Sequence, residues 1–415
     1  MVGPDQEGEA ESWCRSLLDL PPELVQAALA FVDGASLAQC EATCSLLRAT
    51  VTADLWRAAV WQRWGWLVRA AAGTDGAKWR ELYVRLSTGS HTRFRVLGGC
   101  SIEADGFLPE EDMSGAFALN THEHSTTWAS MAPPSSVREM AATVRVADGA
   151  LFAIGGASPE VVSLGGEDDL PMFTMRMNTL RSVEAFADGV WRPMPSLLEP
   201  RCCCGAAVDS VGDIYVVGGG TSMYRGAACL RSVERFDWDA ARWESAPMLR
   251  EARNGVGVAI SHATERLFAF GGYGGDHDYL DTCESMPVGS AVGADARWTE
   301  LPCMSCKRAG PCAAAGPDGR LYVLGGGPDG TDCWASMEAL DPRTSSWDTS
   351  LAQANTARHY NAAAFGPDGK LYVSGAFRHA GQLDVVERYD PVADKWEKLS
   401  GIGFVVKFSS GVFTF

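Results

Sequence analysis

Short apolar runs that end in a pair of glycines recur along the C-terminal three-quarters of the chain. The runs at 151–154 and 214–217 are four residues long and are built from aliphatic and aromatic residues. This pattern predicts strands that are covered on both faces. Glycine directly after such a strand predicts a sharp exit where backbones approach closely. The pairs are Gly98-Gly99, Gly155-Gly156, Gly218-Gly219, Gly271-Gly272 and Gly325-Gly326, with a weaker one at Ser374-Gly375.

A tryptophan follows each glycine pair, and before most of these tryptophans apolar and polar residues alternate. Such alternation predicts a half-buried strand. Asp-Gly dipeptides precede three of the glycine-pair strands and predict tight hairpins. The tryptophans are Trp128, Trp191, Trp243, Trp298, Trp347 and Trp396, and the dipeptides are Asp148-Gly149, Asp318-Gly319 and Asp368-Gly369.

One unit therefore predicts four antiparallel strands, and six such units from residue 91 to residue 415 predict a mainly β, six-bladed propeller. The first unit lacks its opening strand, while a spare run follows Trp396. Residues 410–415 resemble the opening strand at 254–259, so we expect the C-terminal strand to complete the first blade and remove the free sheet edges. The double glycine, the later aromatic residue and the tryptophan resemble the kelch repeat, which implies a kelch-type β-propeller of four-stranded blades.

The first ninety residues have a helical pattern instead. Leu20, Pro21 and Glu23 match the opening of the F-box, and Leu29, Asp33, Leu37, Cys44 and Leu55-Trp56 match its later positions. We expect an acidic disordered segment at 1–15, an F-box-like helical domain at 16–64 and a helical linker at 65–90. The resemblance implies binding to the Skp-type adaptor of a cullin ligase through Leu20, Pro21, Leu24, Leu29, Leu37 and Leu47. The alternative is that most of these side chains form the small domain's own core.

Charge and cysteine content narrow the partners and the compartment. The formal net charge of −17 repels phosphate backbones, so neither nucleic acid nor an anionic membrane is expected as a partner. The 13 cysteines, the acidic N-terminus and the lack of a long apolar run favour a reducing compartment, either cytoplasm or nucleus.

Target binding is expected where the loops gather at one end of the propeller channel. An arginine recurs between units and predicts a ring that grips a carboxylate-bearing peptide, unless each arginine bonds backbone carbonyls of its own repeat. The long loop at 157–179 contains methionines and a phenylalanine that suit protein recognition. The candidate residues are Arg138, Arg201, Arg253, Arg308, Arg358, Met172, Phe173, Tyr273, His277 and Tyr279.

No catalytic residue, cofactor or metal is expected. Kelch-like propellers include galactose-oxidase relatives, but no tyrosine pair accompanies His122 and His124. The spacing of Cys303 and Cys306 leaves a zinc site open, and Arg201 beside Cys202–Cys204 leaves a redox-sensitive thiol open. The resemblance as a whole implies the substrate-recognition subunit of an SCF-type ubiquitin ligase. The alternatives are a kelch scaffold without a ligase role, for example a cytoskeletal one, and a propeller enzyme.

Overall fold

The computed structural model describes residues 93–97, 102–103, 106–107, 116–120, 128–130, 132–146, 150–163, 173–187, 189–222, 228–275, 278–289, 296–328, 332–375, 385–399 and 410–414. The predicted adaptor-binding residues, His122, His124, Met172 and His277 lie outside these ranges, as does the Asp148-Gly149 turn. The side chain of Phe173 is also outside the description. Within the described ranges the chain forms no helix that is long and apolar enough to span a membrane.

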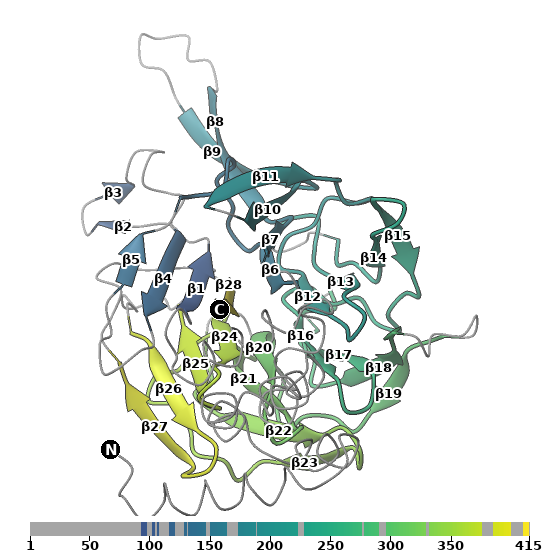
Figure 1. Cartoon of the computed structure of the whole chain (residues 1–415), viewed down its shortest axis with the longest axis vertical. Coiled ribbons are helices and arrows are strands. Elements are labelled where there is room, and N and C mark those ends of the chain that lie inside the picture. Colours follow the sequence, from purple (N-terminus) through teal and green to yellow (C-terminus); the bar gives the residue numbers. More distant parts are fainter. Residues whose placement is uncertain are drawn as a thin grey trace, which may run out of the picture.

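Five four-stranded antiparallel blades follow one another along the chain (Figure 1). Blade I contains β6 (Ala142–Arg145), β7 (Leu151–Ile154), β10 (Val183–Ala187) and β11 (Val190–Met194). Blade II contains β12 (Gly205–Val208), β13 (Ile214–Val217), β14 (Val233–Asp237) and β15 (Arg242–Ala246). Blade III contains β16 (Gly257–Ser261), β17 (Arg266–Phe270), β18 (Cys283–Pro287) and β19 (Thr299–Leu301).

Blades IV and V repeat the same order of strands. Blade IV contains β20 (Ala309–Ala315), β21 (Leu321–Gly327), β22 (Met337–Asp341) and β23 (Ser346–Asp348). Blade V contains β24 (Ala362–Phe365), β25 (Leu371–Ser374), β26 (Glu387–Asp390) and β27 (Lys395–Lys398). The predicted order of four strands is therefore found in each of these blades, with a glycine pair after the apolar run of the second strand in blades I to IV and the single Gly375 in blade V.

A further four-stranded sheet joins the two ends of the described chain. Its order is β28 (Ser410–Thr414), β1 (Arg93–Leu97), β4 (Ala116–Asn120) and β5 (Trp128–Ser130). β28 pairs antiparallel with β1, from Arg93 opposite Thr414 to Leu97 opposite Ser410. The innermost strands contact one another in the order β6, β12, β16, β20, β24, β28 and back to β6. The C-terminal strand thus completes this closing sheet, as the sequence predicts. The sequence predicts six blades, and the structure has five with described side chains plus this sheet.

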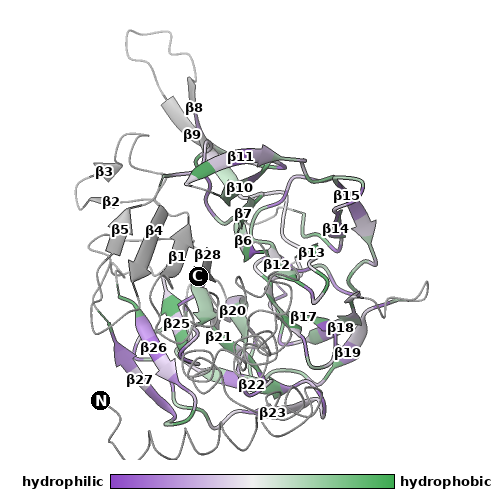
Figure 2. Cartoon of the chain, viewed as in Figure 1, coloured by the Kyte–Doolittle hydropathy of each residue, from purple (hydrophilic) through white to green (hydrophobic). Residues whose placement is uncertain are grey.

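The apolar cores lie between neighbouring blades. One cluster joins Val144 and Phe152 of blade I to Ile214, Val216 and Phe236 of blade II. Equivalent clusters join blades II and III, blades III and IV, and blades IV and V. Figure 2 shows hydrophobic residues along β17 and β25 and hydrophilic ones along the outer strands β15 and β27. Each blade is therefore stabilised by its neighbours, because the apolar side chains on its faces are buried against the adjacent blades.

The long segment at 157–179 is not the loop expected from the sequence. It forms a hairpin in which β8 (Ala157–Ser163) pairs with β9 (Phe173–Thr179), from Ala157 opposite Thr179 to Ser163 opposite Phe173. Pairing of the two strands satisfies backbone N–H and C=O groups that an irregular loop would leave to hydrogen-bond with solvent. Figure 1 shows this hairpin standing out from the rim of the propeller. A much shorter pair, β2 (Ile102–Glu103) and β3 (Gly106–Phe107), comes between β1 and β4 along the sequence.

Candidate protein-binding face of the propeller

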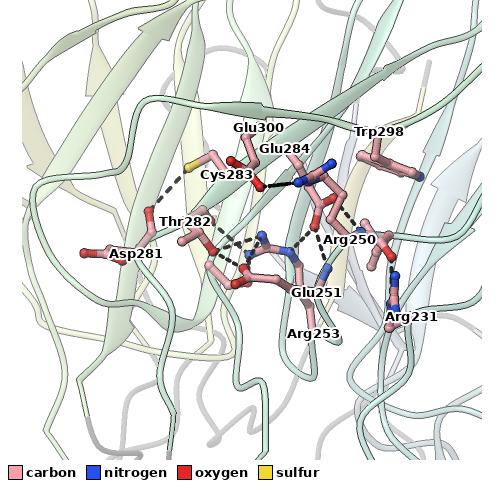
Figure 3. Close-up of polar contacts among 12 residues, drawn as sticks. Arg231, Arg250, Glu251, Arg253, Asp281, Thr282, Cys283, Glu284, Trp298 and Glu300 are labelled. Carbon is pink, nitrogen blue, oxygen red and sulfur yellow. Dashed lines mark hydrogen bonds and ion pairs between the residues drawn. The ribbon is translucent and has the colours of Figure 1, made fainter.

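The recurring arginines are buried and already bonded. Figure 3 shows Arg253 between Glu251, Thr282 and Glu284. Its Nε donates to Glu284 Oε1 at 2.8 Å, and its Nη1 donates to the carbonyls of Gly271 and Thr282 at 2.8 and 2.9 Å. Glu284 also accepts the main-chain amide of Arg250, which lies in the link from blade II, at 2.8 Å. The ion pair therefore fixes the entry to blade III against its glycine turn.

The same arrangement recurs in the other four blades. Each arginine donates to the carbonyl of the glycine that follows the apolar run of the second strand and pairs with a glutamate on the third strand, and at most 3% of the arginine is exposed. Burial raises the pKa of Glu184, but hydrogen bonds from Ser135 and Arg138 outweigh it, so the pKa of Glu184 is lowered overall. The pairs are Arg138–Glu184, Arg201–Glu234, Arg253–Glu284, Arg308–Glu338 and Arg358–Glu387.

These five pairs correct the expected carboxylate-gripping ring. An arginine that is at most 3% exposed presents no guanidinium group to a target, and its Nη1 group donates to backbone carbonyls inside the blade. The second reading, that each arginine bonds carbonyls of its own repeat, describes the structure. The arginine and the glutamate are buried together because burying either charge without its partner would destabilise the fold.

The glycine pairs bond each blade to the next. The amide of Gly272 donates to the carbonyl of Arg308 at 2.8 Å, and a Cβ on Gly271 would lie only 2.3 Å from that same oxygen. Gly219 and Arg253 repeat the hydrogen bond at 2.8 Å, and Gly326 and Arg358 repeat it at 2.9 Å. The close approach predicted from the sequence is confirmed. Glycine is required because a side chain would displace the neighbouring blade.

The tryptophans secure the links between blades from the outside. The indole Nε1 of Trp243 donates to the carbonyl of Pro195, and that of Trp298 donates to the carbonyl of Pro247, both at 2.9 Å. Trp191, Trp347 and Trp396 make the equivalent bonds to Ala132, Pro302 and Ala352. The repeat residues seen in the sequence are therefore structural, and a binding site has to come from positions that vary between repeats.

Those variable positions gather on what we call the loop face, the end of the channel formed by residues that follow the arginines and the glycine pairs. Two residues after each arginine the backbone has positive φ, at Met140, Cys203, Gly255, Gly310 and Tyr360. Four hydrogen bonds of 2.8–3.0 Å run through this set, each from the amide of one member to the carbonyl of the member before it. The set therefore forms an arc of main-chain bonds around the channel mouth.

Tyr360 covers much of this mouth. Its ring atoms would lie 3.0–3.1 Å from a Cβ placed on Gly255 or Gly310, so two glycines in the arc leave room for it. It packs against Met140, Cys202 and Cys203. Burial is the main cause that raises the pKa of Tyr360 well above its ordinary value, so the phenol stays neutral. A cavity of about 140 Å³, lined by small side chains of the inner strands, adjoins the arc.

Aromatic and apolar side chains continue outward across the loop face. The rings of Tyr273 and Tyr279 lie 5.1 Å apart and are half-buried. Between them in the sequence, the exposed Asp278 pairs with Lys307 at 3.2 Å. Met177 of β9 packs against the Tyr360 cluster, and Thr179 Oγ1 donates to the carbonyl of Thr221 at 2.7 Å. The base of the β8–β9 hairpin is therefore tied to the loop face.

Two roles were considered for the cysteines from the sequence, a redox-sensitive thiol activated by Arg201 and a zinc site at Cys303 and Cys306. Burial raises the pKa of Cys204 to about 12, despite the opposing charge of Arg201. The hydrogen bond between Cys202 and Cys203 lowers the pKa of Cys202 and raises that of Cys203 well above its usual value, so Arg201 is not the group that activates a thiol here. Among the described residues, no set of three or more His, Cys, Asp or Glu side chains is arranged to hold a metal ion, and this includes Cys303 and Cys306.

The sequence is similar to known kelch proteins. The KLHDC2/KLHL20/DRC7 Kelch-repeats domain matches residues 205–412, which is half of the 415-residue chain. Kelch-like protein 34 of Homo sapiens is 27% identical over 222 residues, which cover 50% of this chain and 32% of the human protein. Kelch-like protein 36 of Rattus norvegicus is 32% identical over 109 residues, which cover 26% of this chain and 17% of the rat protein. The chain thus matches about a third or less of these curated relatives' length.

The fold is also similar to that of a solved structure. The structure titled "Structure of YjhT" superposes with a TM-score of 0.54 at 15% identity, and covers 69% of this chain and 91% of that one. At this identity the likeness concerns the fold alone.

Proposed function

Since the chain belongs to the kelch-repeat family, we propose that its loop face holds a partner protein. We further propose that the chain is the substrate-recognition subunit of a cullin-based, SCF-type ubiquitin ligase. The partner would be a protein marked for ubiquitination, and the chain would perform no chemistry itself. Its contribution would be effective concentration, because a bound target is held near the ubiquitin-carrying enzyme.

The β8–β9 hairpin carries the first part of this proposal. Its base is fixed to the loop face by Met177 and Thr179, while its strands run out from the rim (Figure 1). In blades II and III the described parts of the corresponding connections contain isolated bridges, such as Gly220 with Cys229. A firmly rooted element that extends past its neighbours costs little ordering entropy on binding, which suits recognition of another protein.

The Tyr273–Tyr279 pair gives the same face an aromatic surface. Tyrosine supplies a large contact area and a hydroxyl with few rotatable bonds, which is why aromatic residues are enriched at protein interfaces. The pair lies on the connection after the glycine pair of blade III, and its neighbour Asp278 is exposed. The two tyrosines replace the five buried arginines as the residues that we expect to meet the target.

The ligase role rests on the N-terminal resemblance. Leu20, Pro21 and Glu23 match the opening of the F-box. The expected adaptor surface is formed by Leu20, Pro21, Leu24, Leu29, Leu37 and Leu47. The proposal places the protein in the cytoplasm, the nucleus or both. The alternative is a kelch scaffold without a ligase role, in which the N-terminal leucines contact only one another.

An adaptor pull-down separates these two functions. The full chain and a variant with Leu20→Ala, Pro21→Ala and Leu24→Ala would be compared for capture of a purified Skp-type adaptor. Capture by the full chain that is lost in the variant supports the receptor, provided that both propellers melt at the same temperature. A full chain that captures no adaptor would leave the scaffold as the function.

A further inference from the structure

A thiol and an imidazole meet at the junction between blades IV and V. The Sγ atom of Cys333 lies 2.6 Å from Nδ1 of His359. Cys333 belongs to the connection between β21 and β22, and His359 follows Arg358 at the entry to β24. The amide of Arg358 donates to the carbonyl of Trp334 at 3.1 Å, so the backbone itself brings the two side chains together.

The same backbone bond occurs at three other junctions. Its donors and acceptors are Arg201 to Leu180, Arg253 to Leu230, and Arg308 to Leu280, at 3.0–3.1 Å. The residue before each acceptor and the residue after each donor therefore occupy the positions of Cys333 and His359. These equivalent pairs are Thr179 with Cys202, Cys229 with Asn254, and Tyr279 with Ala309. Among these four described junctions, the one between blades IV and V combines a thiol with a base.

The surroundings suit a reactive sulfur. Cys333 is half-buried on the loop face and is not in a disulfide, so a small reagent can approach it. His359 is only 2% exposed, and its ring packs edge-on against Tyr360 with centroids 5.2 Å apart. Arg358, which precedes His359 in the sequence, is paired with Glu387 at 3.0 Å, and Asp332, which precedes Cys333, is exposed. The imidazole is thus held in place next to an accessible thiol.

We propose that Cys333 and His359 form a nucleophilic pair that is a covalent modification site for soft electrophiles, namely α,β-unsaturated carbonyl compounds. His359 takes the thiol proton on Nδ1, and the thiolate electron pair forms a bond from sulfur to the β-carbon. The π electrons of the carbon–carbon double bond move onto the carbonyl as an enolate. The enolate then takes the proton back from the imidazolium, so the addition is balanced and requires no oxidant.

A covalent adduct at Cys333 would affect binding at the loop face. The adduct would lie on the loop face, where Tyr360, the neighbour of His359, covers the channel mouth. If that face binds the target, as proposed above, the adduct would compete with the target. This consequence depends on the proposed function, whereas the reactivity of Cys333 does not.

The test is native-state labelling of the full chain with N-ethylmaleimide, with the rate at each cysteine measured by mass spectrometry. Cys229 is the matched control, because it has the same position in its repeat and is also half-buried, while its repeat has Asn254 at the position of His359. At pH 6.5 we expect Cys333 to react roughly tenfold faster than Cys229. The pH profile of Cys333 should lie at lower pH than that of Cys229.

Two substitutions exchange the histidine and the asparagine at the position that corresponds to each thiol. His359→Asn should reduce the rate at Cys333 to that of Cys229, and Asn254→His should raise the rate at Cys229. Equal rates in the unmodified protein overturn the proposal without any variant. A His359→Asn protein that keeps its melting temperature and its fast Cys333 also overturns it. No adaptor or target enters this assay, so its failure is distinct from failure of the proposed function.

Discussion

The main-chain amide of Gly272 in blade III donates to the carbonyl of Arg308, which opens blade IV, at 2.8 Å. The preceding residue, Gly271, has φ of +58° and lies so close that a Cβ there would meet the Arg308 oxygen at 2.3 Å. Arg308 in turn donates to the carbonyl of Gly325 at 2.7 Å. Glycine pairs and buried arginines therefore form one continuous connection from blade to blade.

Gly271→Ala should destabilise the protein severely. The substitution adds a clash with the backbone of the next blade to the strain of positive φ, so we expect a loss of about 4 kcal/mol in unfolding free energy. Gly212→Ala is the matched control, because Gly212 also has positive φ but its Cβ would meet nothing within 4 Å. That variant should lose only about 1 kcal/mol. Similar urea midpoints for both variants would show that contact between blades is not the reason for the glycine.

Removing both members of a buried ion pair should destabilise the protein less than the sum of the two single removals. Arg253→Met or Glu284→Leu alone leaves an unpaired buried charge, and we expect each to lose about 3–5 kcal/mol. The double variant should lose clearly less than the sum, although the amide of Arg250 loses its acceptor. A double-mutant cycle by urea unfolding measures this difference. Strict additivity would contradict the account of the pair.

Acid should weaken the contribution of Glu184. Burial raises the pKa of this carboxyl, but hydrogen bonds from Ser135 and Arg138 outweigh it and lower the pKa overall. The stabilisation that ionised Glu184 provides is therefore complete above the pKa that this carboxyl has in the unfolded chain. It is lost as the pH falls through the lower pKa that the carboxyl has in the folded protein. The stability difference between the natural protein and Glu184→Gln should be largest above about pH 5 and shrink on acidification. A difference that stays constant down to pH 3 would contradict this assignment.

Removing the residues after Gly401 should open the propeller. β28 would be lost, which leaves β1 without its partner and removes the strand that contacts both β24 and β6. We expect a much lower melting temperature and aggregation through the exposed edges, measured by circular dichroism and light scattering. Shortening the segment between Ser163 and Phe173 is the control and should leave the melting temperature unchanged. A truncated chain that melts like the full one would rule out this closure.

The repeat residues could be predicted because each is dictated by local backbone geometry that recurs. The glycine pairs, the Asp318-Gly319 turn and the facing of Phe236 and Trp243 across β14 and β15 were all visible as spacing. The target-binding residues were harder to predict, because an arginine recurs at the same spacing whether it faces a ligand or a buried glutamate. The repeating glutamates on the third strands, Glu184 and Glu234 among them, were the signal that would have identified the arginines as structural.

Two features depend on contacts that no local pattern reveals. The hairpin of β8 and β9 looked like a loop because Pro159 and the mixed polar sequence weaken the strand signal. The proximity of Cys333 and His359 arises from a hydrogen bond between residues of two blades, 24 positions apart from Trp334 to Arg358. Sequence spacing alone therefore could not bring the two side chains together.

The most direct test of the central claim is quantitative proximity labelling by the full chain in its native cell. A variant with Tyr273→Ala and Tyr279→Ala would be compared with the unmodified chain and with Val392→Ala, a control on an outer turn where the side chain is 96% exposed. We predict that the loop-face variant loses a defined set of labelled proteins that the control retains, and that ubiquitination of those proteins falls. Identical labelling by all three chains would contradict a target-binding loop face.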